Sequence, residues 1–182
     1  MKHYSKAELY CKIRELRAQF GICPDDYPLN VLDLCDKYPG IQVCFYNFKT
    51  VGLKGMAHIG EGTDNDVIIV NAKQEKAERN FTITHEVMHL IFHRDEPIKQ
   101  FSCYDKVRST QNSYVEWQAN EGAAEFIIPA FLFLKIIKEE WNTLHTSRDF
   151  AKLKDHLSLK FNATPHVIEI RYEHLKYEIF QC

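Results

Sequence analysis

The sequence contains no long hydrophobic run. Although 45% of its 182 residues are hydrophobic, no apolar stretch approaches the roughly 20 residues that a membrane-spanning helix requires. Residues 1–5 lead into an amphipathic pattern instead of the apolar segment of a secretion signal. We therefore expect a cytoplasmic protein that has no membrane partner.

Paired cysteines and an excess of positive charge are also missing. The six cysteines include no C-x-x-C pair, so a cysteine-based zinc site or redox motif is not supported, and we expect reduced thiols. The formal net charge of -2 argues against direct binding of nucleic acid. Length and hydrophobic content are enough for one globular domain with a buried core.

Changes in hydrophobic periodicity divide this expected single domain, residues 1–182, into four parts. Residues 1–40 predict two helices, one over 5–20 that opens with a capping box of Ser5 and Glu8, and one over 30–37. Residues 41–71 change to two-residue alternation and predict three short strands, at 41–46, 55–59 and 66–71. Residues 73–129 predict two helices joined by a polar loop over 94–112, and residues 130–182 predict C-terminal helices. The fold class is therefore α+β.

The most informative motif is H-E-x-x-H, formed by His85, Glu86 and His89. Between residues 75 and 93 there is no Gly or Pro, and apolar residues recur at helical spacing over most of the circumference, which predicts a buried helix. On that helix the two histidines lie one turn apart on the same face, where both can bind one Zn²⁺ ion. Glu86 can then act as a general base toward the attacking water. Such a site needs a third protein ligand.

A third histidine ligand is not available at the spacing that some metallopeptidases use. The pattern H-E-x-x-H-x-x-G-x-x-H requires Gly and His where this chain has Phe92 and Asp95. His93 lies roughly 12 Å along the helix axis from His85, too far to share an ion without a break in the helix. We therefore expect His93 to support the site or to end the helix.

A carboxylate from the second helix is the remaining choice, and Glu116 is favoured. Asn120 follows it by four residues, so a ligand and an amide able to orient a neighbouring histidine share one face. Glu121 and Glu125 remain competitors for the ligand position. Ser113 and Glu116 also fit a capping box, in which Glu116 would only start the helix.

At this point the sequence resembles the ImmA/IrrE metallopeptidases, the M78 peptidase family. The matching segments, in order, are VIIVN at 67–71, RNFT at 79–82, HEVMHL at 85–90 with His93, EWQAN at 116–120 and AAEFIIP at 123–129. The resemblance implies that His85, His89 and Glu116 bind zinc and that Glu86 is the general base. It also implies a protein substrate, a helix-turn-helix transcriptional repressor whose cleavage releases stress-response or mobile-element genes.

We thus expect a zinc-dependent endopeptidase. Its fold would be a small three-stranded antiparallel or mixed sheet packed on a mainly helical, zincin-like core, followed by C-terminal helices that resemble a helix-turn-helix. The alternative is a non-hydrolysing, antitoxin-like regulator that binds and sequesters a repressor. The intact Glu86 argues against this alternative, because a purely structural zinc has no use for a neighbouring carboxylate.

The substrate-binding elements are less clear from the sequence. The strand that contains Met56, Ala57 and His58 is the candidate edge strand for pairing with an extended peptide, and a core position for it is the alternative. Several residues could stabilise the oxyanion, and the sequence does not rank them: His58, Tyr114, His145 and His166. The C-terminal helices expected at 148–160 and 165–175 carry mixed charges, which favours packing against the core over contact with DNA.

Overall fold

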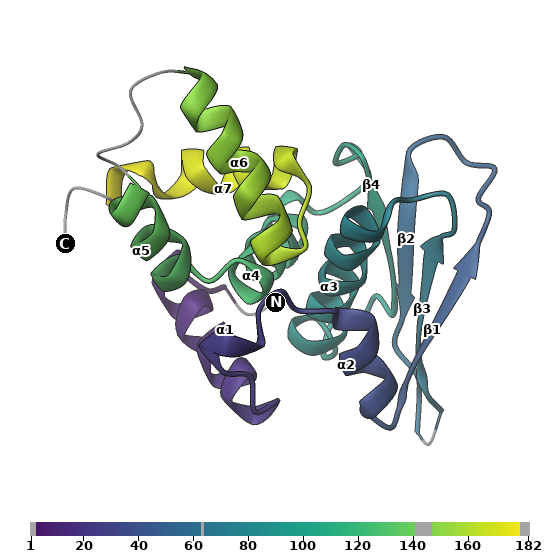
Figure 1. Ribbon diagram of the computed structural model, residues 1–182. Coiled ribbons are helices and arrows are strands. Elements are labelled where there is room, and N and C mark those ends of the chain that lie inside the picture. Colours follow the sequence, from purple (N-terminus) through teal and green to yellow (C-terminus); the bar gives the residue numbers. More distant parts are fainter. Residues whose placement is uncertain (1–2, 63, 141–146, 179–182) are drawn as a thin grey trace.

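The computed structural model describes residues 3–62, 64–140 and 147–178 (Figure 1). The helices in this part of the chain are α1 (Lys6–Gln19), α2 (Val31–Lys37), α3 (Lys76–Phe92), α4 (Ser113–Ile127), α5 (Ala130–Glu140), α6 (Ser147–Phe161) and α7 (Pro165–Leu175). Two short 3-10 helices span Pro24–Asp26 and Lys176–Glu178. The strands are β1 (Ile41–Tyr46), β2 (Leu53–His58), β3 (Asp66–Asn71) and β4 (Gln100–Tyr104).

Local sequence signals set several of these boundaries. Helix α1 begins after Ser5, whose hydroxyl accepts from the backbone of Glu8 while the Glu8 side chain accepts from the backbone of Ser5. Helix α7 begins after Thr164, whose hydroxyl accepts from the backbone of Val167, with Pro165 in the first turn. Both caps were expected from the sequence, because their donors and acceptors all lie within a single turn.

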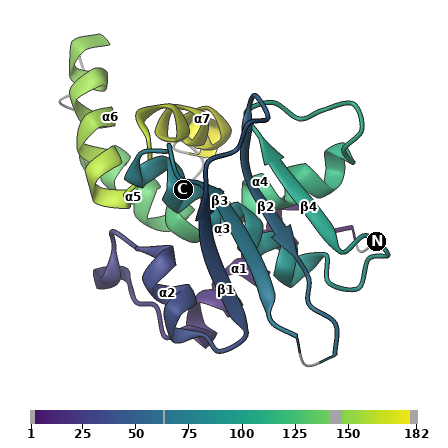
Figure 2. The same ribbon diagram turned by 90° about the vertical axis from the view of Figure 1, so that its right-hand side faces the viewer.

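The four strands form one mixed sheet in the order β1-β3-β2-β4 (Figure 2). Strand β1 runs parallel to β3, and β2 runs antiparallel to both β3 and β4. The α+β class and the mixed sheet are confirmed, but the sheet has four strands where three were expected. Strand β4 lies inside the segment that was expected to be an irregular loop.

The position of β2 corrects the prediction about substrate binding. Met56, Ala57 and His58 pair with β3 on one side and with β4 on the other, so β2 is an interior strand. Its main-chain hydrogen-bonding groups are therefore used within the sheet. The strand at the edge beside α3 is β4, whose residues were expected to form a loop.

The helices cover one face of the sheet in successive layers. Helix α3 packs directly on β2, β3 and β4, with α2 beside it against β1, and α4 packs on the outer side of α3 (Figure 1). Helix α1 packs in turn against α4. The core between these layers is apolar and includes Ile68, Val70, Met88, Ala119 and Ala123. The polar residues of α3 are thus enclosed between the sheet and α4.

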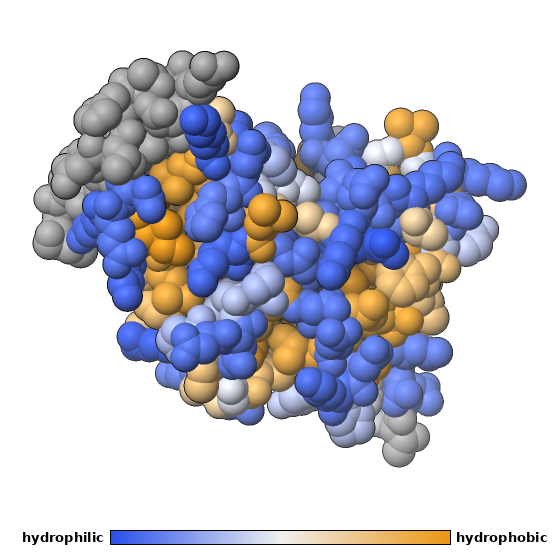
Figure 3. Space-filling model, viewed as in Figure 1, coloured by the Kyte–Doolittle hydropathy of each residue, from blue (hydrophilic) through white to orange (hydrophobic). Residues whose placement is uncertain are grey.

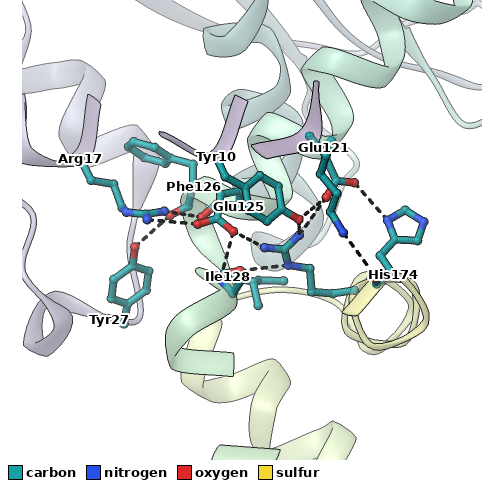
Figure 4. Close-up of polar contacts among 11 residues, drawn as sticks. Tyr10, Arg17, Tyr27, Glu121, Glu125, Phe126, Ile128 and His174 are labelled. Carbon is teal, nitrogen blue, oxygen red and sulfur yellow. Dashed lines mark hydrogen bonds and ion pairs between the residues drawn. The ribbon is translucent and has the colours of Figure 1, made fainter. Parts of the chain in front are cut away.

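A buried ion-pair cluster joins α4 to α1 and α7 (Figure 4). Arg171, which is 1% exposed, contacts the carboxylates of Glu121 and Glu125. Arg17 binds Glu125 at 3.1 Å from the other side, and Tyr10 donates to Glu121. Leaving one of these buried charges without its partner would cost roughly 3 to 5 kcal/mol. The cluster therefore fixes how the N-terminal and C-terminal helices dock on α4.

The surface is mixed in character. On the face that Figure 3 shows, hydrophilic residues predominate and hydrophobic residues form small separate groups. Among the described residues, no helix is long and apolar enough to cross a membrane.

Candidate metal centre

Helix α3 places the two histidines of the H-E-x-x-H motif on the face that α4 covers. His85 and His89 are 1% and 0% exposed, and their Nε2 atoms are 3.0 Å apart. Two imidazole nitrogens at this distance can share at most one proton, whereas a cation between them could be bound by both. The helical spacing expected from the sequence has therefore brought both nitrogens to one point.

Glu116 reaches the same point from α4. Its carboxylate oxygens lie 3.4 Å from His85 Nε2 and 3.8 Å from His89 Nε2, and all three residues are buried. The helices can approach closely because α4 carries small residues here. A Cβ atom at Gly122 would lie only 3.2 Å from Met88 Sδ on α3. One ligand atom from each of His85, His89 and Glu116 lies within 4.8 Å of the other two.

The Ser113 capping box, which was the alternative explanation for Glu116, is wrong. The cap of α4 is Asn112, whose side chain accepts from the backbone of Tyr114 and Val115. The Glu116 side chain is therefore available to the two histidines.

Glu121 and Glu125 do not take part in the candidate centre. Both point to the other side of α4 and belong to the cluster with Arg171 described above (Figure 4). His174 adds a contact to Glu121 at 3.0 Å. The sequence alone could not exclude these two carboxylates, because their main partner comes from α7, about 50 residues further along the chain.

Asn120 orients His85. Its Oδ1 atom lies 3.0 Å from His85 Nδ1 and can only accept a hydrogen bond, so His85 Nδ1 must carry the proton. When His85 is neutral, as a metal ligand must be, its lone pair resides on Nε2, which faces Glu116. This is the arrangement that the four-residue spacing of Glu116 and Asn120 led us to expect.

A longer chain of hydrogen bonds orients His89. His89 Nδ1 lies 2.9 Å from His93 Nδ1, His93 Nε2 lies 3.0 Å from Gln118 Oε1, and Gln118 Nε2 donates to the Tyr114 hydroxyl at 3.2 Å. The Tyr114 hydroxyl donates in turn to the backbone carbonyl of Tyr4 at 2.7 Å. Because Gln118 Oε1 accepts, His93 is protonated on Nε2 and His89 on Nδ1. The His89 lone pair therefore also lies on Nε2, toward the centre.

Glu86 differs from every other carboxylate of the site because it has no partner. It is 0% exposed, and neither of its oxygens makes a hydrogen bond. Burial raises the pKa of Glu86 to about 7; His85 and the backbone of Cys103 oppose the increase, and Glu116 adds to it. A carboxyl with this pKa can both accept and release a proton near neutral pH.

The electrostatics of the pocket favour a positive charge. Burial alone would lower the pKa of His85, but Cys103, Glu116 and Glu86 raise it well above its usual value. Burial, together with His85 and His93, lowers the pKa of His89 far below its usual value, so His89 is neutral and able to act as a ligand. Two buried carboxylates beside two histidines thus stabilise a cation.

The donor set fits zinc. Two imidazole nitrogens and a carboxylate are ligands that zinc uses in hydrolases, where a fourth position stays open for reaction. The fixed tautomers of His85 and His89, the approach of Glu116 and the unpartnered carboxylate of Glu86 agree with this assignment.

A cleft of about 680 Å³ runs beside the centre. It is bounded by β4 with the segment after it, the first half of α3, α4 and α7. Two of its lining residues, Cys103 and Asn120, also neighbour His85 of the buried centre. A substrate held in the cleft would therefore lie beside the two residues that adjoin the candidate metal ligands.

The structure separates the oxyanion candidates. His166 lines the cleft, whereas the Tyr114 hydroxyl is bound to Tyr4 and Gln118. His58 is exposed at the end of β2 and does not line the cleft. His145 lies outside the described residues.

Two features of the site were not predicted from the sequence, strand β4 and the role of Gln118. Strand β4 carries Phe101, which stacks on His89 with ring centroids 4.4 Å apart, and Cys103, which lies beside His85 and Glu86. The alternation of Gln100, Phe101, Ser102 and Cys103 was a two-residue signal for a strand. Gln118 was missed because nothing in the sequence links it to His93 on another helix.

Together, a mixed sheet, an H-E-x-x-H helix on its face and a glutamate helix over the histidines define a metallopeptidase-type site. The family described as Peptidase_M78, IrrE N-terminal-like domain, matches residues 36–172. The chain belongs to this family, whose peptidases are metal-dependent hydrolases. No curated protein matches the chain.

Proposed function

We propose that this protein is a zinc-dependent endopeptidase. The observation that carries the proposal is the convergence of His85 Nε2, His89 Nε2 and the Glu116 carboxylate beside the unpartnered carboxylate of Glu86. A structural metal site would need the first three groups, but it would give no role to a fully buried, unpartnered glutamate.

The roles of the residues follow from their environments. When bound, zinc supplies a Lewis acid that polarises the scissile carbonyl and acidifies the attacking water. Glu86 accepts the proton of that water and then delivers it to the leaving amine, for which its pKa of about 7 is suited. Asn120 and His93 keep the lone pairs of His85 and His89 directed at the centre. His166, from the cleft wall, is our candidate for stabilising the oxyanion.

We propose that an extended substrate pairs with the outer edge of β4. The carbonyl of Lys99 and the N–H of Asp105 bond to the backbone at the two ends of β2. Because the direction of these bonds alternates from residue to residue along an antiparallel strand, the backbone groups of Ser102 face away from β2. The carbonyl of Ser102 accepts from the Gln111 side chain at 2.7 Å. The Gln111 side chain would have to move when a peptide strand takes its place, and the pairing would then supply main-chain bonds without requiring a particular sequence.

The proposed substrate is a cytosolic helix-turn-helix repressor, whose cleavage would release stress-response or mobile-element genes. This part rests on the resemblance to the ImmA/IrrE peptidases. A cleft bordered by an edge strand suits an unfolded or extended segment of such a protein, not its folded helices.

The test is to incubate the zinc-loaded protein with the helix-turn-helix repressor encoded nearest to it, and to follow cleavage by mass spectrometry. We expect the wild type to cut the repressor at a defined bond and Glu86→Gln to bind zinc without cutting. Cutting by Glu86→Gln at the wild-type rate would refute the role of Glu86. Stable binding of the intact repressor by both forms, without cleavage, would instead support the non-hydrolysing regulator.

A further inference from the structure

Cys103 is the one cysteine of the described chain that lies at the candidate metal centre. It is on β4, opposite Gly55 of β2, and is 8% exposed. Because Gly55 has no side chain, the space above it is filled from α3 by Glu86, whose Oε1 is 2.9 Å from an ideal Cβ position at Gly55. Cys103 and Glu86 thus share one small space between the sheet and α3.

The thiol is close enough to contribute to metal binding. Cys103 Sγ, a ring nitrogen of His85 and a carboxylate oxygen of Glu86 all lie within 4.8 Å of one another, and all three residues are buried. Zinc binds sulfur at about 2.3 Å and nitrogen at about 2.0 Å, so ligand atoms on one ion lie roughly 3.5 Å apart. His89 and Glu116 do not belong to this group, so the Cys103 side chain would have to rotate toward them to share their ion.

The surroundings of the thiol also indicate a ligand. Both oxygens of Glu86 are buried and have no hydrogen-bond partner, and one of them lies within 4.8 Å of Cys103 Sγ. Cys103 also borders the cleft, as do Thr82 and Asn120. The thiol therefore borders both the substrate cleft and His85.

We propose that Cys103 is a fourth metal ligand in the resting protein and that its thiolate fills the position that water needs for hydrolysis. The inference rests on the proposed zinc peptidase function. On binding, the S–H bond breaks, a sulfur–metal bond forms, water leaves, and the carboxylate of Glu86 takes the proton. The four-ligand site would be closed and inactive, as in structural zinc sites, and would open when substrate and water displace the thiolate, which takes the proton back from Glu86 and so restores the base.

The proposal distinguishes metal binding by Cys103 from simple packing of a small apolar side chain. Cys35 provides the matched control because it is also buried but lies on α2, away from the centre. Burial raises the pKa of Cys35 to about 12, so its thiol is not reactive at neutral pH. Cys23 is exposed and serves as the reactive reference.

The first measurement is the absorption spectrum of the full chain titrated with cobalt(II) alone. We expect a sulfur-to-cobalt charge-transfer band in the wild type and in Cys35→Ala, and its loss in Cys103→Ala. We also expect Cys103→Ala to bind zinc roughly tenfold more weakly or worse. Absence of the band in the wild type, or its persistence in Cys103→Ala, would overturn the proposal.

A second measurement uses the wild-type protein and so does not depend on the folding of a variant. Alkylation by iodoacetamide is followed by peptide mass spectrometry with and without zinc. We expect zinc to slow the modification of Cys103 at least tenfold while Cys23 reacts equally in both states. If zinc changed the alkylation rates of the two thiols by the same factor, the proposal would also be overturned.

These results can be separated from the fate of the peptidase proposal. Repressor cleavage by the wild type without a charge-transfer band would refute only the role of Cys103. A charge-transfer band without any cleavage would support Cys103 as a ligand and refute the peptidase function. If both proposals hold, Cys103→Ala cleaves the repressor faster than Cys35→Ala, because its fourth position is open.

Discussion

Substitution of Gly55 by alanine should separate the general base from the metal ligands. A Cβ atom at this position would lie 2.9 Å from Glu86 Oε1 and 2.6 Å from Thr82 Cγ2, where ordinary contacts begin at 3.4 Å. The Glu86 carboxylate must therefore move by about half an ångström. His85, His89 and Glu116 do not supply any of the three atoms nearest to the new methyl group.

The size of the effect follows from these distances. Displacement of a catalytic group by up to about 1 Å can cost on the order of 100-fold in rate, so we expect kcat/KM for repressor cleavage to fall about 10- to 100-fold in Gly55→Ala. The tight contact with Thr82 should also lower the free energy of unfolding by about 1 to 3 kcal/mol. Zinc affinity should change by less than about threefold, because the ligands stay in place.

The double variant Gly55→Ala/Thr82→Ser makes the test specific. Serine removes the Cγ2 methyl group but retains the hydroxyl that accepts from Gln74 Nε2 at 2.9 Å. We expect it to restore stability, measured by urea denaturation, without restoring cleavage. Recovery of full activity together with stability would show that overpacking, and not displacement of Glu86, caused the loss.

Three further predictions concern the ligands and their supports. Gln118→Leu should weaken zinc binding by about 10- to 100-fold, measured by competition with a chromophoric chelator, because it breaks the chain that fixes the His89 tautomer; an unchanged affinity would refute that role. Glu116→Ala should lose most zinc affinity while Glu121→Ala keeps it, and the reverse result would move the ligand to Glu121. Burial raises the pKa of Glu121, but Tyr10 and Arg171 lower it below its usual value overall. The ionised Glu121 therefore stabilises the folded protein above the unfolded-state pKa of about 4.3, and this stabilisation is lost as the pH falls through the lower pKa of the folded state. The melting temperature of Glu121→Gln should therefore fall less between pH 5 and 3, roughly, than that of the wild type, and parallel curves would contradict this linkage.

The sequence predicted the relative positions of the candidate ligands where its signals are local. His85 and His89 share a face because they are four residues apart on one helix, and Glu116 with Asn120 repeats this spacing on α4. The caps at Ser5 and Thr164 also depend on residues within a single turn. Such relations are fixed by helix geometry and need no knowledge of the tertiary fold.

The errors arose where a residue's role depends on distant parts of the chain. The order of strands in a sheet is decided by packing, so β2 could not be recognised as an interior strand. Glu125 could not be excluded as a ligand until Arg171 and Arg17 were seen to neutralise it. Cys103 reaches His85 only because β4 pairs with β2 under α3.

The central claim is that one zinc ion is held by His85, His89 and Glu116. The most direct measurement is anomalous X-ray diffraction at the zinc edge from crystals of the zinc-loaded protein. The account predicts a single strong peak roughly 2.0 to 2.2 Å from His85 Nε2, His89 Nε2 and a Glu116 oxygen. A peak elsewhere, or one bound to the histidines without Glu116, would contradict it.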